Sequence, residues 1–109
     1  MIQVTILRDR EKLVKGIEIN GHAGYAEYGQ DVICAAVSAL ALNMANSVEA
    51  FTDDSFEGSA AEDGGSFTFS FSGEISPESQ LLMKSLILGL ESIRDDYGAE
   101  YINFRFREV

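Results

Sequence analysis

The chain of 109 residues is poor in the residues that build disulfides, metal centres and linkers. It has one cysteine, one histidine, one proline and no tryptophan. A single cysteine cannot close an internal disulfide, and one Cys with one His is too few for a usual zinc site. Long runs rich in Pro, Ser and Gly are also missing, which excludes a disordered linker. We therefore expect a single domain over residues 1–109, in a reducing compartment, with no metal or other cofactor.

Basic residues are scarce as well. Eight Lys and Arg stand against 18 Asp and Glu, so the formal net charge is −10. This balance argues against direct binding to a nucleic-acid backbone, which requires cations. It favours a basic protein partner, although acidic charge also serves solubility alone. The sequence shows no apolar run near the roughly 20 residues that cross a bilayer, and no signal peptide, so we expect a cytoplasmic protein without a membrane segment.

Apolar periodicity predicts five strands and two helices. Alternating apolar residues indicate strands around 2–6, 17–20, 67–71 and 102–106, with a hairpin partner for the third of these at 55–61. An Ala-rich helical pattern covers about 33–51, and a second helix follows the start signal Ser76-Pro77 and ends at Gly98. The resulting order, ββαββαβ, predicts an α+β two-layer fold with a mixed sheet covered by two helices.

The only histidine and the only cysteine lie close together in the sequence. His22 lies in a loop that carries Gly21, Gly24 and Gly29, and Cys34 falls in the first turn of the predicted helix, after Asp31 as its N-cap. A helix N-terminus and a nearby imidazolium both lower a thiol pKa, so we expect an activated thiolate here. His22 would act as general base and then acid, and free amides at the helix start would bind an oxyanion.

Each of these residues also has a purely structural interpretation. Cys34 lies among small apolar residues and is compatible with a buried hydrophobe. His22 is compatible with an ordinary surface or core histidine, Asp31 with a helix cap only, and Ser38, one turn beyond Cys34, with a small core residue. Spacing alone leaves both interpretations open.

The segments Gly21-His22-Ala23-Gly24-Tyr25 and Asp31-Val32-Ile33-Cys34-Ala35-Ala36-Val37-Ser38 closely resemble the ribosomal-processing cysteine protease (Prp) family of bacteria. The resemblance covers essentially the whole chain. It implies that His22 and Cys34 are the catalytic pair. Asp31 and Ser38 match motif positions, to which we assign a role as helix cap or site support. We expect the substrate loop to comprise Gly21, Ala23, Gly24 and Tyr25.

The resemblance also implies a substrate. This is the short N-terminal extension of a basic large-subunit ribosomal protein, cut after a pair of phenylalanines and before a small residue. Two alternatives remain from the residues themselves: another thiol hydrolase that uses the same pair, or a non-catalytic acidic module that binds a basic ribosomal protein. A homodimer is also possible, because small domains with exposed strand edges often pair.

Overall fold

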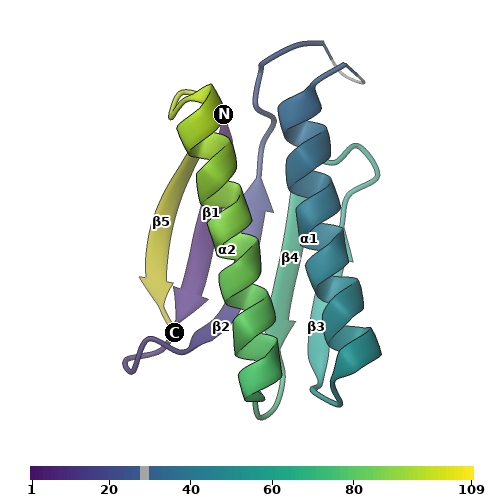
Figure 1. The fold of residues 1–109 in the computed structure, drawn as a ribbon, viewed down its shortest axis with the longest axis vertical. Coiled ribbons are helices and arrows are strands. Elements are labelled where there is room, and N and C mark those ends of the chain that lie inside the picture. Colours follow the sequence, from purple (N-terminus) through teal and green to yellow (C-terminus); the bar gives the residue numbers. More distant parts are fainter. Residues whose placement is uncertain (28–29) are drawn as a thin grey trace.

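The computed structural model has the predicted order of elements and describes residues 1–27 and 30–109 (Figure 1). Its strands and helices, in chain order, are β1 (Ile2–Arg8), β2 (Val14–Asn20), α1 (Val32–Phe51), β3 (Phe56–Ala60), β4 (Ser66–Phe71), α2 (Pro77–Tyr97) and β5 (Ile102–Glu108). The prediction of an α+β fold with a mixed sheet and two helices is therefore confirmed.

The strands form one sheet in the order β3-β4-β2-β1-β5. Neighbouring strands are antiparallel except for β1 and β5, which run parallel, with Ile2 opposite Ile102 and Arg8 opposite Glu108. The two strands at the edges of the sheet are thus β3 and β5. The loop between β2 and α1 lies at one end of the sheet. The start of β1 and the β3–β4 turn lie at the same end (Figure 1).

Both helices begin at the residues that the sequence indicates. The side chain of Asp31 caps α1 by accepting from backbone amides of its first turn. Ser76 caps α2 in the same way, with Pro77 at the first helical position, and Gly98 ends α2 with a φ of 125°. These caps satisfy donors that a helix leaves unpaired at its start, and they fix where each helix begins.

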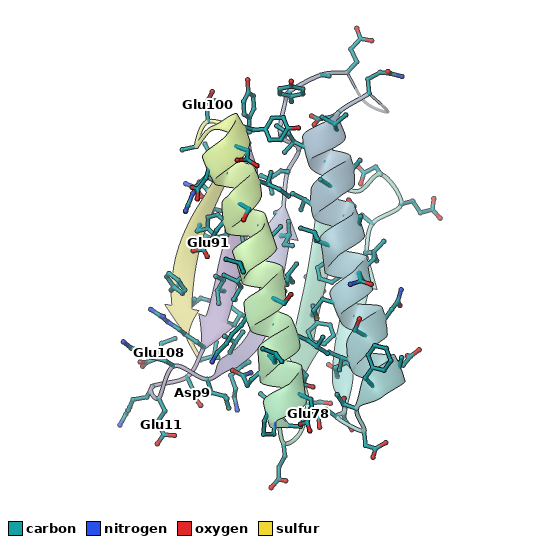
Figure 2. The ribbon with its side chains drawn as sticks, in the orientation of Figure 1. Asp9, Glu11, Glu78, Glu91, Glu100 and Glu108 are labelled. Atoms are coloured by element: carbon teal, nitrogen blue, oxygen red, sulfur yellow. The ribbon has the colours of Figure 1, made fainter. Side chains whose placement is uncertain are left out.

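The core lies between the helices and one face of the sheet. Figure 2 shows the side chains on the ribbon, with the labelled acids Glu78 and Glu100 at opposite ends of the molecule. The buried side chains on α1 recur at helical spacing and face alternating apolar residues of the central strands. They are Ile33, Val37, Ala41, Met44 and Val48.

Helix α1 is more apolar than the sequence expectation allowed. It has 20 residues, and an 18-residue window of it has a mean hydropathy of 1.4, so it is long and apolar enough to span a membrane by length and composition alone. Here its buried stripe packs on the sheet instead, and a core helix meets the same compositional test.

Candidate active site

Cys34 lies in the first turn of α1, half-buried beneath the loop that follows β2. The backbone amide of Ala23 donates a hydrogen bond to the Cys34 Sγ atom over 3.2 Å. Ala23 is itself buried, at 4% exposure, and directly follows His22. The fold therefore brings the only cysteine against the loop that carries the only histidine.

The side chain of Asp31 joins the first turn of α1 to the loop that follows β2. Its Oδ1 atom accepts from the amides of Ile33 at 3.0 Å and Cys34 at 3.1 Å, while Oδ2 accepts from the amide of Tyr25 at 3.0 Å. One carboxylate thus caps the helix and ties the loop to it. The predicted N-cap is confirmed, and its second contact adds a role in shaping the loop.

The pKa of the Cys34 thiol differs from the expectation. Burial raises the pKa of Cys34, and the negative charge of Asp31 raises it further, while the hydrogen bond from Ala23 acts in the opposite direction. The sequence led us to expect a lowered pKa, and that expectation was wrong. A helix N-terminus that is already occupied by a carboxylate offers much less positive potential to a thiolate.

The pKa of Asp31 is lowered. Burial acts to raise the pKa of this carboxyl, but hydrogen bonds from the backbone of Cys34, Tyr25 and Ala26 outweigh burial. Asp31 therefore carries its negative charge at neutral pH.

The cap of α1 occupies two of the backbone amides at the helix start, where we expected an oxyanion to bind. The amides of Ile33 and Cys34 donate to Asp31 and are not available to a substrate oxygen in this arrangement. The donor that already contacts the sulfur is the amide of Ala23, which comes from the loop instead of the helix.

His22 lies on the rim of the same cleft as Cys34. A cavity of about 430 Å³ is lined by both residues, together with Gly24, Asp31, Ser38 and other residues. Across it, the β3–β4 turn brings Asp63, whose Oδ2 atom is 3.9 Å from Nε2 of His22. Since the His22 side chain is 46% exposed, its ring is accessible from solvent.

The loop from Gly21 to Tyr25 is anchored at both ends. Gly21 has a φ of 94°, and a Cβ at this position would lie 2.5 Å from the carbonyl oxygen of Met1, so only glycine fits there. Its amide donates to the carbonyl of Gly65 over 2.9 Å. The Tyr25 ring packs edge-on against Tyr97 and Tyr101, with centroid distances of 5.6 and 5.3 Å, instead of lining the cleft.

Of the other predicted loop residues, Gly24 lines the cleft with a φ of 73°. Gly29 lies outside the described residues. Ser38 is half-buried one turn beyond Cys34, and it lines both the cleft and the apolar cavity described next.

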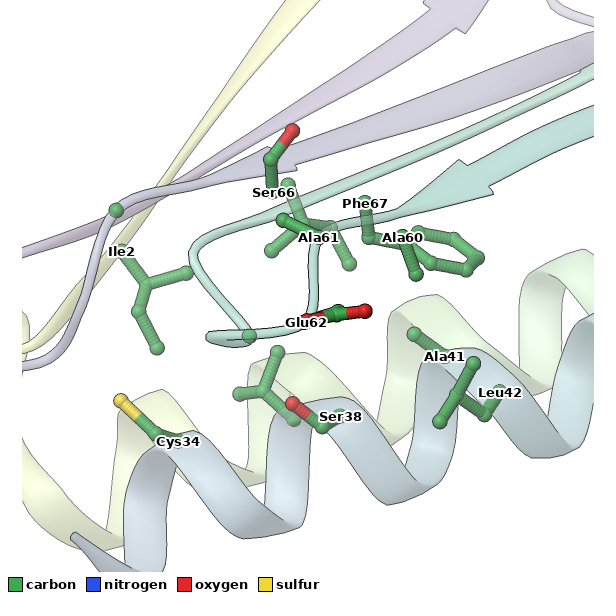
Figure 3. A pocket seen from close by; sticks show the side chains of 14 residues that line it. Ile2, Cys34, Ser38, Ala41, Leu42, Ala60, Ala61, Glu62, Ser66 and Phe67 are labelled. Carbon is green, nitrogen blue, oxygen red and sulfur yellow. The ribbon is translucent and has the colours of Figure 1, made fainter. Parts of the chain in front are cut away.

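An apolar cavity of about 220 Å³ opens beside the thiol (Figure 3). Figure 3 shows Cys34 and Ser38 on α1 along one side, facing Ala61 and Phe67 of the β3–β4 hairpin, with Glu62 between the hairpin and the helix. The remaining lining residues are mostly aliphatic and include Ile2, Ile19, Val37, Ala41 and Leu42. A cavity of this kind suits an apolar side chain that lies next to a reacting bond.

No group of three or more His, Cys, Asp or Glu side chains within residues 1–27 and 30–109 is arranged to hold a metal ion. The chemistry that these residues offer is that of a thiol and an imidazole.

A half-buried thiol that shares an open cleft with an imidazole, on a two-layer α+β scaffold, defines a cysteine hydrolase. The comparisons with known proteins agree and are more specific. The family model described as cysteine protease Prp matches residues 1–103, so the chain belongs to this family of cysteine proteases.

Among curated relatives, the ribosomal processing cysteine protease Prp of Bacillus subtilis is 40% identical over 101 residues, covering 89% of this chain and 90% of the relative. The Staphylococcus aureus protein of the same name is 29% identical over 98 residues, covering 90% and 92%. A crystal structure of Prp from S. aureus with a covalently linked product peptide has a TM-score of 0.91 at 28% identity, covering 98% of this chain and all of that one. A second, with a substrate peptide, has a TM-score of 0.85 at 27% identity and the same coverage.

Sequence reasoning missed the contribution of the β3–β4 turn. The residues Glu62-Asp63-Gly64-Gly65 have the composition of a tight turn, which gives no sign of a role in the site. In the fold Asp63 faces His22, and the carbonyl of Gly65 accepts from the loop. The two segments are about 40 residues apart along the chain, and only the pairing of β2 with β4 brings them together. Knowing that Asn20 lies opposite Ser66 would have placed the turn beside His22. Apolar periodicity does not reveal which strands pair, so the sequence alone did not show this.

Proposed function

We propose that this cysteine protease removes the N-terminal extension of a large-subunit ribosomal protein, with Cys34 as nucleophile and His22 as general base and acid. The observation that carries the proposal is that the thiol and the imidazole line one open cleft, directly beside an apolar cavity. The names of the relatives, which are ribosomal processing proteases, support the substrate class.

The reaction begins when the imidazole of His22 takes the proton of the Cys34 thiol and the sulfur attacks the scissile carbonyl carbon. The carbonyl oxygen becomes an oxyanion, and the amide of Ala23, which donates to the sulfur in the free protein, is the backbone donor we assign to it. His22 then gives its proton to the leaving nitrogen, the C–N bond breaks, and a thioester remains on Cys34. Water attacks the thioester with His22 as base, and the C–S bond breaks to return the thiol and release the new carboxyl end.

The raised pKa of Cys34 makes the imidazole essential to this scheme. Burial and the Asp31 carboxylate keep the sulfur protonated in the free protein. Proton removal must therefore be coupled to attack or to a change in the cleft when substrate excludes water.

The apolar cavity supports an aromatic residue next to the cut. It lies against Cys34 and is enclosed by aliphatic side chains and Phe67, so burial of a phenylalanine ring there would be favourable by roughly 2 kcal/mol. The net charge of −10 and the acids of the β3–β4 turn support a basic protein as substrate, because opposite charge speeds encounter.

The test is mass spectrometry of a peptide that carries a Phe-Phe pair followed by a small residue, incubated under reducing conditions with the wild type and with Cys34→Ala. We expect one cut after the pair with the wild type and none with the variant, while both proteins bind the peptide and melt alike. Cleavage by both proteins would exclude Cys34 as nucleophile.

An intact peptide with folded wild type would instead favour the acidic binding module, and turnover of small amide or thioester compounds alone would favour another thiol hydrolase.

We also propose a cytoplasmic location and a homodimer. The single cysteine suits a reducing compartment. The strands β3 and β5 are sheet edges through which two copies can pair. Light scattering across protein concentrations tests the dimer, and a monomer mass at all concentrations would contradict it.

A further inference from the structure

We propose that Asp63, on the turn between β3 and β4, is a positioning residue for His22. It would hold the imidazole in the tautomer with hydrogen on Nε2 and stabilise the imidazolium that forms when the thiol is deprotonated. The proposal rests on the function proposed above, and it adds a residue from a segment that the sequence motif does not include.

The first argument is the position of the carboxylate. Asp63 Oδ2 lies 3.9 Å from Nε2 of His22, which is within ion-pair distance of a charged ring. A carboxylate that faces one ring nitrogen favours hydrogen on that nitrogen, and this leaves the lone pair on Nδ1. Nδ1 then becomes the nitrogen that exchanges the proton with the thiol and the leaving amine.

The second argument is that the carboxylate is itself fixed. Asp63 Oδ1 accepts from the amide of Gly65 over 2.9 Å, so one oxygen is held by the turn while the other faces the ring. In other hydrolases a fixed carboxylate orients the catalytic histidine through a hydrogen bond, whereas here the 3.9 Å separation is that of an ion pair.

The third argument is that the turn and the loop are joined by backbone. The amide of Gly21 donates to the carbonyl of Gly65 over 2.9 Å, so the residue before His22 is tied to the residue that holds Asp63. A Cβ on Gly65 would lie only 2.9 Å from His22 Nε2 and 3.2 Å from Asp63 Oδ1. The missing side chain of Gly65 therefore leaves the space that the ring and the carboxylate share.

The other acid in the cleft is engaged elsewhere. Asp31 also lines the cavity that His22 and Cys34 share, but both of its oxygens accept from backbone amides of the loop and of α1. Its charge acts mainly on the thiol, whose pKa it raises. Asp63 is thus the carboxylate of this cleft that is directed at the imidazole.

The test compares Asp63→Asn with Glu57→Gln. Asparagine keeps an oxygen that can accept from Gly65, so the turn is retained while the charge is lost. Glu57→Gln removes the same charge from an exposed position on β3 that lines neither the cleft nor the apolar cavity. We expect Asp63→Asn to lower kcat about five-fold with little change in KM, and to move the acidic limb of the pH profile of kcat/KM. Glu57→Gln should leave that limb in place, and Asp63→Glu should recover part of kcat.

A second readout does not depend on activity. Because His22 is the only histidine, its ring nitrogens give one unambiguous set of NMR signals in the ¹⁵N-labelled protein. We expect the wild type to show mainly the Nε2–H form at high pH and Asp63→Asn to show a larger share of the Nδ1–H form. Unchanged tautomer populations together with an unchanged pH profile in folded Asp63→Asn would overturn the proposal. If wild type failed to cleave at all, the proposed function would fall, while the tautomer measurement would still decide the role of Asp63.

Discussion

The amide of Cys34 donates to the carboxylate of Asp31 over 3.1 Å, and the charge of that carboxylate raises the pKa of the Cys34 thiol. One side chain therefore stabilises the start of the nucleophile's helix and also disfavours the reactive form of the nucleophile. The arrangement keeps the sulfur protonated in the free protein at neutral pH. A protonated thiol is less readily oxidised or alkylated than a thiolate, which protects the only cysteine in the chain.

Asp31→Asn should lower the pH at which Cys34 becomes reactive. Asparagine still caps the helix, but it removes the charge that raises the thiol pKa. The measurement is the rate of iodoacetamide alkylation against pH, and its midpoint should move to lower pH. Glu27→Gln, which removes an exposed charge from the same loop, serves as the control. An unmoved midpoint in Asp31→Asn would show that burial alone raises the pKa.

Asp31→Ala should destabilise the protein by about 1–2 kcal/mol, because alanine leaves the cap amides and the Tyr25 amide without their acceptor. The sign of the pH dependence follows from the lowered pKa of Asp31. Its stabilisation is complete above the unfolded value of about 3.9 and is lost as pH falls through the folded value. Urea unfolding at pH 6 and pH 3 tests both points. The wild type should lose more stability than Asp31→Ala between these two pH values, and an equal loss would contradict the linkage.

Gly65→Ala should impair cleavage far more than folding. The new methyl would meet His22 Nε2 at 2.9 Å and so displace the ring or the turn. Displacement of a catalytic group by a fraction of an ångström lowers kcat by roughly ten-fold or more. Gly73→Ala is the matched control, since a Cβ there meets nothing within 4 Å. Steady-state kinetics and thermal melts of the two variants test this, and equal kinetics would argue against a close approach of His22 to the turn.

Leu42→Asp should weaken binding of the aromatic substrate segment. Leu42 is 47% exposed on α1 and lines the apolar cavity, so a carboxylate there would make the cavity less favourable for a phenyl ring. We expect KM to rise about three- to ten-fold with little change in stability. Leu81→Asp, at a 68% exposed position on α2 that does not line the cavity, is the control. If both variants raised KM equally, long-range charge would be the cause instead of the cavity.

The fold was predictable because its periodicities are strong. Alternation in β1, β4 and β5 and the capping residues Asp31 and Ser76 each act locally, and the structure confirms them. The order of strands in the sheet was not predictable, because it depends on pairing between distant segments.

In the candidate site, too, the local features were predictable and the contacts between distant segments were not. Its local part, with Asp31 three residues before Cys34, follows from helix capping. The sign of the thiol pKa shift did not follow, because it depends on how deeply the sulfur is buried and on which amides the carboxylate already occupies. The contact between His22 and Asp63 also could not be seen in the sequence, since it depends on the pairing of β2 with β4.

The parallel pairing of β1 with β5 affects when the protein becomes competent during synthesis. Ile2 lines the apolar cavity beside Cys34, and its amide donates to the carbonyl of Tyr101 over 2.8 Å at the start of β5. Contacts between such distant segments form late, because a long loop must close first. This hydrogen bond of Ile2 therefore forms only after β5 has emerged from the translating ribosome. A nascent copy of the enzyme would have its thiol long before β1 gained its second neighbour in the sheet.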